Sequence, residues 1–275
     1  MKPAPFAYAR PRSLDEAVEI LSGTPDAKVL AGGQSLVPLL SMRLAAPSML
    51  VDVNALPDLA AVRTDAAGIR VGALARHSDL LADQEAARVQ PLVPLALSNV
   101  AHATIRNRGT TVGSLVHADA AAEMPAVLAL LDGSVDVVSV RGRRTIAARD
   151  LVVGPLESSL AHDEIAVEAF FPALADGCGV AFAEIARRHG DYAMCGVAVL
   201  VGDGFVRAAY LSVEEVPTVL DLTGVALDDV GEAALARLDP QPDIHATAAY
   251  RGQLVRVLTE RVVRAAYDDA RRRAA

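Results

Sequence analysis

The sequence predicts an α+β protein, and three observations support this class. Short apolar runs bounded by glycine and proline occur throughout the chain and indicate buried strands. In the first half, segments with helical spacing of apolar residues lie between these runs. Near the end, three consecutive strand-like runs are followed by two helical segments, 231–238 and 246–273. A chain of 275 residues is long enough for one large domain or for two to three smaller ones.

The first expected unit spans residues 1–57 and combines helices with short strands. Ser13 and Glu16 have the spacing of a capping box, which predicts the start of a helix. The elements expected after this helix are a strand, a second helix and another strand, at 28–30, 36–44 and 49–53. A glycine-rich turn, 31–36, joins the first of these strands to the second helix.

The second expected unit spans residues 58–173. Its expected helices begin near residue 79, run from 91 to 101 and run from 124 to 131. Its expected strands are 69–71, 135–140, 145–146 and 165–171. A polar stretch, 104–119, is expected to be a loop between the second and third of these helices.

The third expected unit spans residues 174–275 and begins with a short linker. Strand-like runs follow at 180–185, 193–201 and 206–213. Gly202, Asp203 and Gly204 give a hairpin signal between the last two runs. We therefore predict a C-terminal α+β domain with a three-stranded antiparallel sheet and helices.

Composition excludes several classes of function. The formal net charge of −8 argues against nucleic acid as a general partner, because phosphate binding favours a basic face. Two cysteines, Cys178 and Cys195, are too few for an iron–sulfur cluster, and we expect both to be reduced and buried. The sequence shows neither a signal-peptide pattern nor an apolar run that would span a membrane, so we expect a cytoplasmic protein.

The first glycine loop, residues 31–36, is a candidate phosphate site. It lies between a predicted strand and a predicted helix, so backbone N–H groups at the helix start would face an anion. The side chains of Gln34 and Ser35 could add donors. The alternative is an ordinary strand–helix turn. This is not the Rossmann fingerprint, because G-x-G-x-x-G does not occur. The candidate binding residues are Ala31, Gly32, Gly33, Gln34, Ser35 and Leu36.

The second glycine loop, residues 104–114, is a candidate partner of the first. Thr110, Thr111 and Ser114 offer hydroxyls for phosphate or ribose oxygens, and Gly113 permits close approach of a ligand. Asn107 offers both donors and an acceptor. The alternative is a surface loop. Two loops of this kind suggest one large anionic ligand held from two sides, such as a dinucleotide.

Histidines and carboxylates near the second loop raise the question of a metal site. No motif with metal-ligand spacing supports one, and paired carboxylates and histidines are common in structural roles. We therefore predict no metal ion. The residues considered are His77, His102, His117, Asp119 and Glu123. No G-x-S-x-G nucleophile motif is present either, and we predict no catalytic side chain on this chain.

Three segments resemble the FAD-binding medium subunit of molybdenum hydroxylases, the family of xanthine dehydrogenase and carbon monoxide dehydrogenase. They are AGGQSL, IRNRGTTVGSLVHADAAAE and RRHGDYAMCGVAV, in the family's order and at similar spacing. The resemblance implies a PCMH-type FAD-binding fold, with residues 1–57 and 58–173 as two α/β subdomains. It also implies FAD as cofactor and a heterotrimer with a molybdopterin large subunit and a [2Fe–2S] small subunit.

The resemblance also implies roles for three further residues. Glu123 lies where an acidic residue of the family binds adenosine ribose hydroxyls, Tyr192 is brought near the isoalloxazine ring, and Ile165 borders the flavin. Two positions depart from the family pattern. Val112 stands where the family often has glycine, and Glu184 stands where a relative of the carbon monoxide type has lysine.

The function implied is electron transfer from the [2Fe–2S] clusters of a partner through FAD to an external acceptor. One alternative is a stand-alone FAD-dependent oxidoreductase of the same fold. Another is an assembly subunit that has lost its flavin, an alternative that Val112 and Glu184 keep open.

Overall fold

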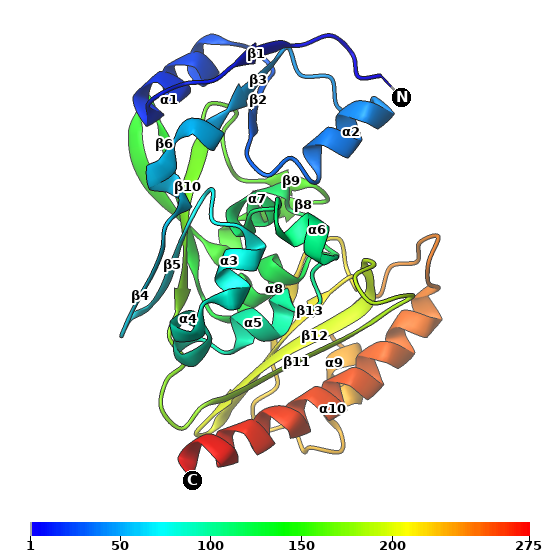
Figure 1. Cartoon of the computed structure of the whole chain (residues 1–275). Helices are drawn as coiled ribbons and strands as arrows, with labels where there is room; N and C mark the ends of the chain where they lie inside the picture. The colour runs from blue at the N-terminus through cyan, green and yellow to red at the C-terminus, as the bar shows by residue number, and fades with distance from the viewer. Residues whose placement is uncertain (1) are drawn as a thin grey trace.

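The N-terminal part of the molecule is a three-stranded parallel sheet with helix α1 (Leu14–Gly23) packed against it (Figure 1). The computed structural model describes residues 2–275, so Met1 of the first expected unit lies outside the described residues. The strands, in spatial order, are β1 (Ala7–Ala9), β3 (Met49–Asp52) and β2 (Ala27–Leu30). The Ser13 hydroxyl accepts a hydrogen bond from the N–H of Glu16 at 3.1 Å, which confirms the predicted helix start.

The sequence analysis missed β1, because three residues are too few to show strand alternation. Helix α2 (Leu36–Met42) follows the first glycine loop, as expected. Two short 3₁₀ helices, η1 (Val53–Ala55) and η2 (Pro57–Ala60), lead out of this sheet.

A five-stranded antiparallel sheet forms the middle of the molecule. Its strands, in spatial order, are β4 (Val62–Asp65), β5 (Gly68–Gly72), β10 (Ile165–Pro172), β6 (Ser134–Ser139) and β7 (Gly142–Ala147). Helices that share its core are α3 (His77–Ala82), α4 (Gln84–Val89), α5 (Leu92–Leu97) and α8 (Glu123–Leu130). Beyond β7 lie η3 (Ala148–Asp150) and a small hairpin of β8 (Val152–Gly154) and β9 (Glu157–Ser158).

The stretch 104–119 was expected to be a loop, and this expectation is wrong for most of its length. It holds helix α6 (Ala103–Arg106) and helix α7 (Thr111–His117). Both helices are short, and α7 is rich in residues of low helix propensity, so no periodic signal is detectable. Tertiary packing makes α7 helical, because Val112 and Leu115 are buried in the central core.

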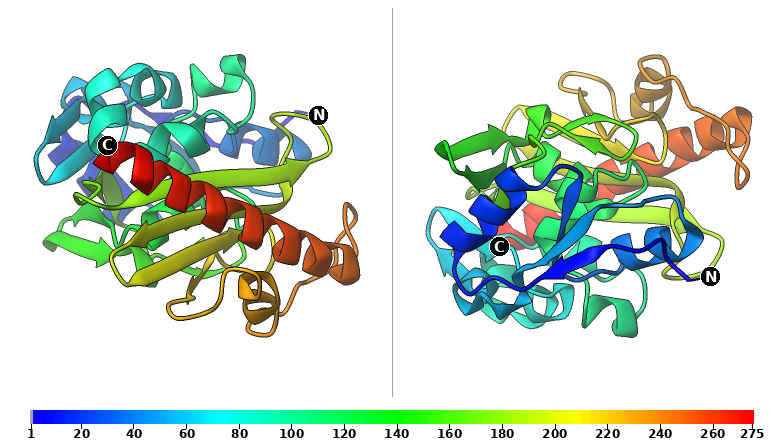
Figure 2. Two further views of the ribbon diagram at one scale, coloured as in Figure 1. Left: turned by 90° about the horizontal axis from the view of Figure 1, so that it is seen from below. Right: turned by 90° about the horizontal axis from the view of Figure 1, so that it is seen from above.

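The C-terminal part is a four-stranded antiparallel sheet with the long helix α10 (Ala248–Ala274) lying diagonally across one face (Figure 2). Its strands, in order, are β11 (Gly179–Ala186), β12 (Ala193–Gly202), β13 (Phe205–Leu211) and β14 (Thr218–Asp221). The three expected strands are present, but the prediction is one strand short, because β14 is only four residues long. The predicted turn at Asp203 and Gly204 joins β12 to β13. Helix α9 (Val230–Leu235) packs against α10.

The opposite face of this sheet packs against helices α5 and α8 of the middle unit. Side chains on the two faces of β12 therefore enter different cores: Ala198 joins the central core, and Val197 and Val199 join the core under α10. The division of the chain at residues 57 and 173 stays a prediction. Cys178 and Cys195 are free and buried. None of the helices within residues 2–275 has the length and apolarity that a membrane crossing requires.

Candidate functional site

The two glycine loops meet, although residues 37–103 lie between them in the sequence. A Cβ atom placed on Gly32 would lie 2.4 Å from the carbonyl oxygen of Arg108 and 2.8 Å from the Cα atom of Gly109. Gly32 therefore has no room for a side chain because the second loop lies against it. The next residue, Gly33, has a φ of 73°, which favours glycine at the turn into α2.

The first loop leaves polar groups accessible beside the turn. Ser35 precedes α2 and its hydroxyl does not cap the helix. The Gln34 side chain is exposed and donates to the carbonyl of Gly32 at 3.3 Å. The backbone N–H of Val37 bonds the carbonyl of Gly33, which closes the first turn of α2. Accessible groups of this kind suit an anion at the loop.

The three hydroxyls of the second loop have different environments. Thr110 is buried, and its Oγ1 accepts a hydrogen bond from the N–H of Gly113 at 3.1 Å, which caps α7. Thr111 is fully buried, and its Oγ1 lies 3.1 Å from Nδ1 of His77. Burial lowers the pKa of His77 to about 4, so the imidazole is neutral near neutral pH.

Ser114 is half-buried, and Asn107 is exposed at the end of α6. The structure thus leaves Ser114 and Asn107 accessible to a ligand, whereas the side chain of Thr111 points into the core. The predicted contact between the Thr111 hydroxyl and a ligand has no support from this geometry. The three hydroxyls were expected to bind alike because a loop has no helical periodicity that sorts side chains, whereas the helix gives them different environments.

Carboxylates gather where α8 begins and the four-stranded sheet ends. Glu123 is the first residue of α8 and is buried, and burial together with the charge of Glu184 raises its pKa to about 8. Burial raises the pKa of Glu184 itself, on β11, to about 7. The N–H of Ser212 bonds the carbonyl of Ala120 at 2.8 Å, so the end of β13 lies beside this segment.

Tyr192 lies at the same place, in the turn between β11 and β12. Its side chain is 63% exposed, yet desolvation and the charges of Asp119 and Glu123 raise the pKa of its hydroxyl to about 12. The turn is held against the start of α6, because a Cβ on Gly190 would lie 2.7 Å from the carbonyl of Ala101 and from the ring of His102. Tyr192 therefore presents an aromatic surface beside the second loop and the carboxyl groups of Asp119 and Glu123.

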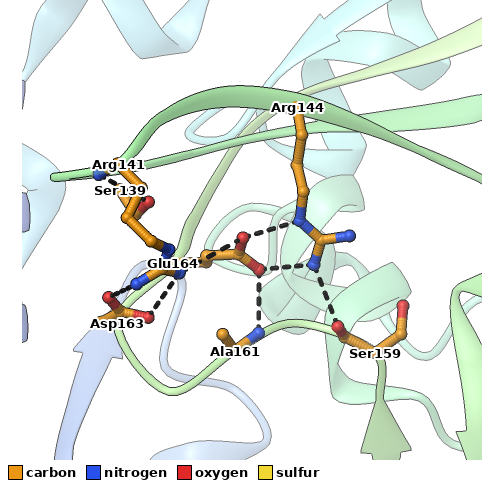
Figure 3. A network of polar contacts seen from close by, with 7 residues as sticks. All are labelled: Ser139, Arg141, Arg144, Ser159, Ala161, Asp163 and Glu164. Carbon is orange, nitrogen blue, oxygen red and sulfur yellow. Dashed lines mark hydrogen bonds and ion pairs between the residues drawn. The ribbon is translucent and has the colours of Figure 1, made fainter.

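Ile165 is not part of this arrangement. It is 2% exposed and belongs to the core beneath α1, together with Val138 and Val167. The two residues before it form ion pairs (Figure 3): Asp163 accepts from Arg141, and Glu164 accepts two bonds of 2.7 Å from Arg144. The predicted contact of Ile165 with a flavin thus has no support from the geometry, since a core side chain offers no surface to a ligand.

Two residues that the sequence does not single out link the two loops, each by contacting one loop and the other residue. Arg76 donates to the carbonyl of Arg108 at 2.7 Å and to Oδ1 of Asn54 at 2.8 Å. Asn54 donates to the carbonyl of Ala31 at 2.9 Å. Neither lies in a recognisable motif, and only the fold brings them together. Within residues 2–275, no group of three or more His, Cys, Asp or Glu side chains could hold a metal ion.

Comparison with known proteins identifies the family. Residues 4–174 match the family model described as the FAD binding domain in molybdopterin dehydrogenase. The chain belongs to this family. The molybdopterin dehydrogenase flavoproteins that it resembles include the 6-hydroxypseudooxynicotine dehydrogenase complex subunit alpha of Paenarthrobacter nicotinovorans, at 41% identity over 98% of this chain and 97% of that protein. The nicotine 6-hydroxylase medium subunit of the same organism is 40% identical over 96% of this chain and 98% of the relative.

Solved structures of two oxidoreductases have the same fold. Quinoline 2-oxidoreductase from Pseudomonas putida 86 aligns with a TM-score of 0.92 and 36% identity, covering 98% of this chain and 99% of the other. Carbon monoxide dehydrogenase from Hydrogenophaga pseudoflava aligns with a TM-score of 0.91 and 30% identity, again over 98% and 99%. The resemblance stated from the sequence is thereby confirmed along nearly the whole chain.

The residues present fit an FAD molecule, as expected for a molybdopterin dehydrogenase flavoprotein. Two glycine loops side by side suit a pyrophosphate. Near the start of α8, Oε2 of Glu184 and Oγ of Ser212 are buried and have no hydrogen-bond partner within residues 2–275. Buried polar atoms are nearly always paired, so these two atoms indicate a polar ligand or water at this place.

Proposed function

We propose that this chain is the FAD-carrying electron-transfer subunit of a heterotrimeric molybdenum hydroxylase. The observation that carries the proposal is the meeting of the two glycine loops in a chain that matches the family over residues 4–174. The residues around the two loops would hold FAD, which when bound would supply the one- and two-electron redox chemistry. The chain itself has to bind the cofactor, orient it and exclude water from it.

We assign binding of the pyrophosphate to the two loops. The first loop contributes backbone N–H groups at Gly33 and the side chains of Gln34 and Ser35, and the second contributes Ser114 and Asn107. The full set of loop residues proposed to lie around the cofactor is Ala31, Gly32, Gly33, Gln34, Ser35, Leu36, Asn107, Thr110, Gly113 and Ser114.

Glu123 and Tyr192 are assigned to the rest of the cofactor. A carboxylate accepts hydrogen bonds from two hydroxyls, so Glu123 suits a ribose. The exposed ring of Tyr192 suits offset stacking on the isoalloxazine. The unpaired Oε2 of Glu184 supports the proposal that a polar edge of the isoalloxazine ring lies nearby. Because Glu184 is an acceptor where a relative has lysine, we expect its environment to tune the flavin differently in this chain.

The partners proposed are a molybdopterin-bearing large subunit and a small subunit with [2Fe–2S] clusters, and the complex is proposed to be cytoplasmic. Several relatives are named as subunits or medium chains, and this chain matches them over nearly their full length. A stand-alone FAD-dependent oxidoreductase would need its own substrate base in a pocket beside the flavin. The names of these relatives as a complex subunit, a medium subunit and a medium chain favour a subunit over the stand-alone enzyme.

For the substrate of the complex we propose a nitrogen heterocycle. Relatives named for nicotine, caffeine and quinoline are 36–40% identical to this chain, whereas those named for glyceraldehyde or carbon monoxide are 29–32% identical. The substrate would bind on the large subunit, so the chain described here carries no contact with it.

The test is expression of the chain together with its neighbouring reading frames, followed by cofactor analysis. We expect about one FAD per chain, with iron and molybdenum in the same complex. Reduction of the flavin by a nitrogen heterocycle, with a dye as acceptor, would support the substrate class. A colourless chain that takes up no added FAD would establish the flavin-free assembly subunit instead. A flavin-containing chain without iron or molybdenum would favour the stand-alone enzyme.

A further inference from the structure

We infer that Arg76 and Asn54 are positioning residues for FAD, which join the two glycine loops into one site before the cofactor binds. The inference rests on the proposed function, and it assigns to these two residues a role that no motif in the sequence indicates. It depends on a continuous chain of hydrogen bonds from one loop to the other.

The chain of bonds begins at the first loop. Nδ2 of Asn54 donates to the carbonyl of Ala31 at 2.9 Å and lies 3.4 Å from the carbonyl of Leu30. The same amide nitrogen lies 2.6 Å from Oδ1 of Asp52, which also accepts the N–H of Asn54 at 2.9 Å. Tyr8 on β1 donates its hydroxyl to the other oxygen of Asp52. Asn54 is therefore fixed to the parallel sheet and to the start of the loop.

The link then passes to Arg76. Oδ1 of Asn54 accepts from Nη2 of Arg76 at 2.8 Å, and Nη1 of the same guanidinium donates to the carbonyl of Arg108 at 2.7 Å. This is the carbonyl against which Gly32 lies. One planar guanidinium thus bonds an amide anchored on the first loop and a backbone oxygen of the second, a fork geometry that lysine cannot reproduce.

Backbone bonds already tie the second loop to the segment that carries Arg76. The N–H of His77 donates to the carbonyl of Gly109 at 3.0 Å, and Arg76 and Thr110 form an isolated β-bridge. By contrast, the hydrogen bonds that connect the first loop to the second within residues 2–275 run through the side chains of Arg76 and Asn54. The first loop follows strand β2 and the second lies among helices of the middle unit, so local chain geometry alone does not set the distance between them.

Fixing the two loops in advance increases affinity for FAD, because the cofactor then does not have to order them. Losing the Arg76 bonds removes about 1.4 kcal/mol of this preorganisation, which corresponds to about a tenfold weaker affinity. The fold itself does not need the link, because the elements that flank each loop have their own packing.

The experiment uses the full-length chain, purified in its complex and then freed of flavin. Arg76→Lys, Asn54→Ala and Asn54→Asp are compared with the unchanged protein. Asn54→Asp keeps an acceptor for Arg76 but removes the donor to Ala31, so it tests the two halves of the link separately. The control is Arg144→Lys, because Arg144 likewise bonds a side-chain oxygen and a backbone carbonyl, those of Glu164 and Ser159, but contacts neither loop.

Three quantities are measured on each variant: the FAD dissociation constant, the thermal unfolding midpoint without flavin, and amide hydrogen exchange in residues 31–36 and 104–110. We expect all three link variants to bind FAD about tenfold more weakly and to exchange faster in both loops, with little change in the midpoint. Arg144→Lys is expected to leave FAD affinity and loop exchange unchanged.

The inference is overturned if the link variants bind FAD within about twofold of the unchanged protein. It is also overturned if Arg144→Lys weakens binding equally, because the effect would then reflect general destabilisation. If the unchanged protein binds no FAD, the proposed function fails. The exchange measurement still decides on the link in that case, since unchanged exchange in both loops would show that no link exists.

Discussion

Replacing Gly32 by alanine tests whether the two loops must touch. The added Cβ would lie 2.4 Å from the carbonyl oxygen of Arg108, whereas ordinary van der Waals contact begins at 3.4 Å, so the second loop must retreat by about 1 Å. The obstacle is backbone on both sides, which cannot rotate away as a side chain can. Overpacking of this kind costs about 1–3 kcal/mol of folding free energy. In a chain of this size that lowers the melting temperature by roughly 2–10 °C.

The retreat also separates the groups proposed to hold the pyrophosphate. We expect the FAD dissociation constant to rise by at least about tenfold, because cofactor binding would then have to close the gap. The assay is FAD titration of the flavin-free chain, together with its thermal unfolding. The control is Gly23→Ala at the end of α1, where an added Cβ meets nothing within 4 Å and φ is not positive. This control should leave FAD binding unchanged.

If Gly32→Ala binds FAD as tightly as the unchanged protein and melts at the same temperature, the loops do not meet as described. If only the melting temperature falls, the contact is structural and the loops do not act together on the cofactor.

Three further predictions concern single side chains. Glu184→Gln should raise the melting temperature of the flavin-free chain more above pH 7 than below pH 4.5. In the folded chain the buried carboxyl has a pKa of about 7 instead of 4.5, so its ionisation lowers the free energy of unfolding as pH rises through this range. Tyr192→Ala should weaken FAD binding about 2- to 10-fold and increase flavin fluorescence, whereas Tyr192→Phe should keep both near the original values. Tyr210→Phe should lower the free energy of unfolding by about 1–3 kcal/mol, because it leaves the buried Thr259 hydroxyl without its 3.0 Å partner.

Each of these has an outcome that contradicts it. A melting difference for Glu184→Gln that is constant with pH would mean that this carboxyl does not titrate differently in the folded chain. Equal affinities for Tyr192→Ala and the unchanged protein would remove the ring from the site. For Tyr210, the check is Tyr210→Phe combined with Thr259→Val: the double variant should recover stability, and a simply additive loss would speak against the hydrogen bond.

Much of the fold was accessible from the sequence because local signals and burial agree there. Ser13 caps α1 where the capping box predicts, and the hairpin at Asp203 and Gly204 joins two strands that alternate as expected. The errors have a common cause. Helices α6 and α7 and strands β1 and β14 are each three to seven residues long, so periodicity is too short to detect and packing decides their structure.

The candidate site divides in the same way. The sequence by itself determined that two glycine loops exist, that Glu123 and Tyr192 follow in the family's order, and that the chain lacks cysteines for its own cluster. Only the tertiary structure decided which of these groups stay accessible. Thr111 points to His77 because α7 buries one side, and Ile165 lies in the core because its end of β10 packs beneath α1.

The role of Gly32 also follows only from the tertiary structure. From the sequence it is a glycine in a phosphate-type turn, but in the fold it makes room for the carbonyl of Arg108. Arg76 and Asn54 carry no signal in the sequence, because a hydrogen-bonded link between two loops depends on how two sheets are placed relative to each other. Local sequence encodes the loops, and long-range packing sets the distance between them.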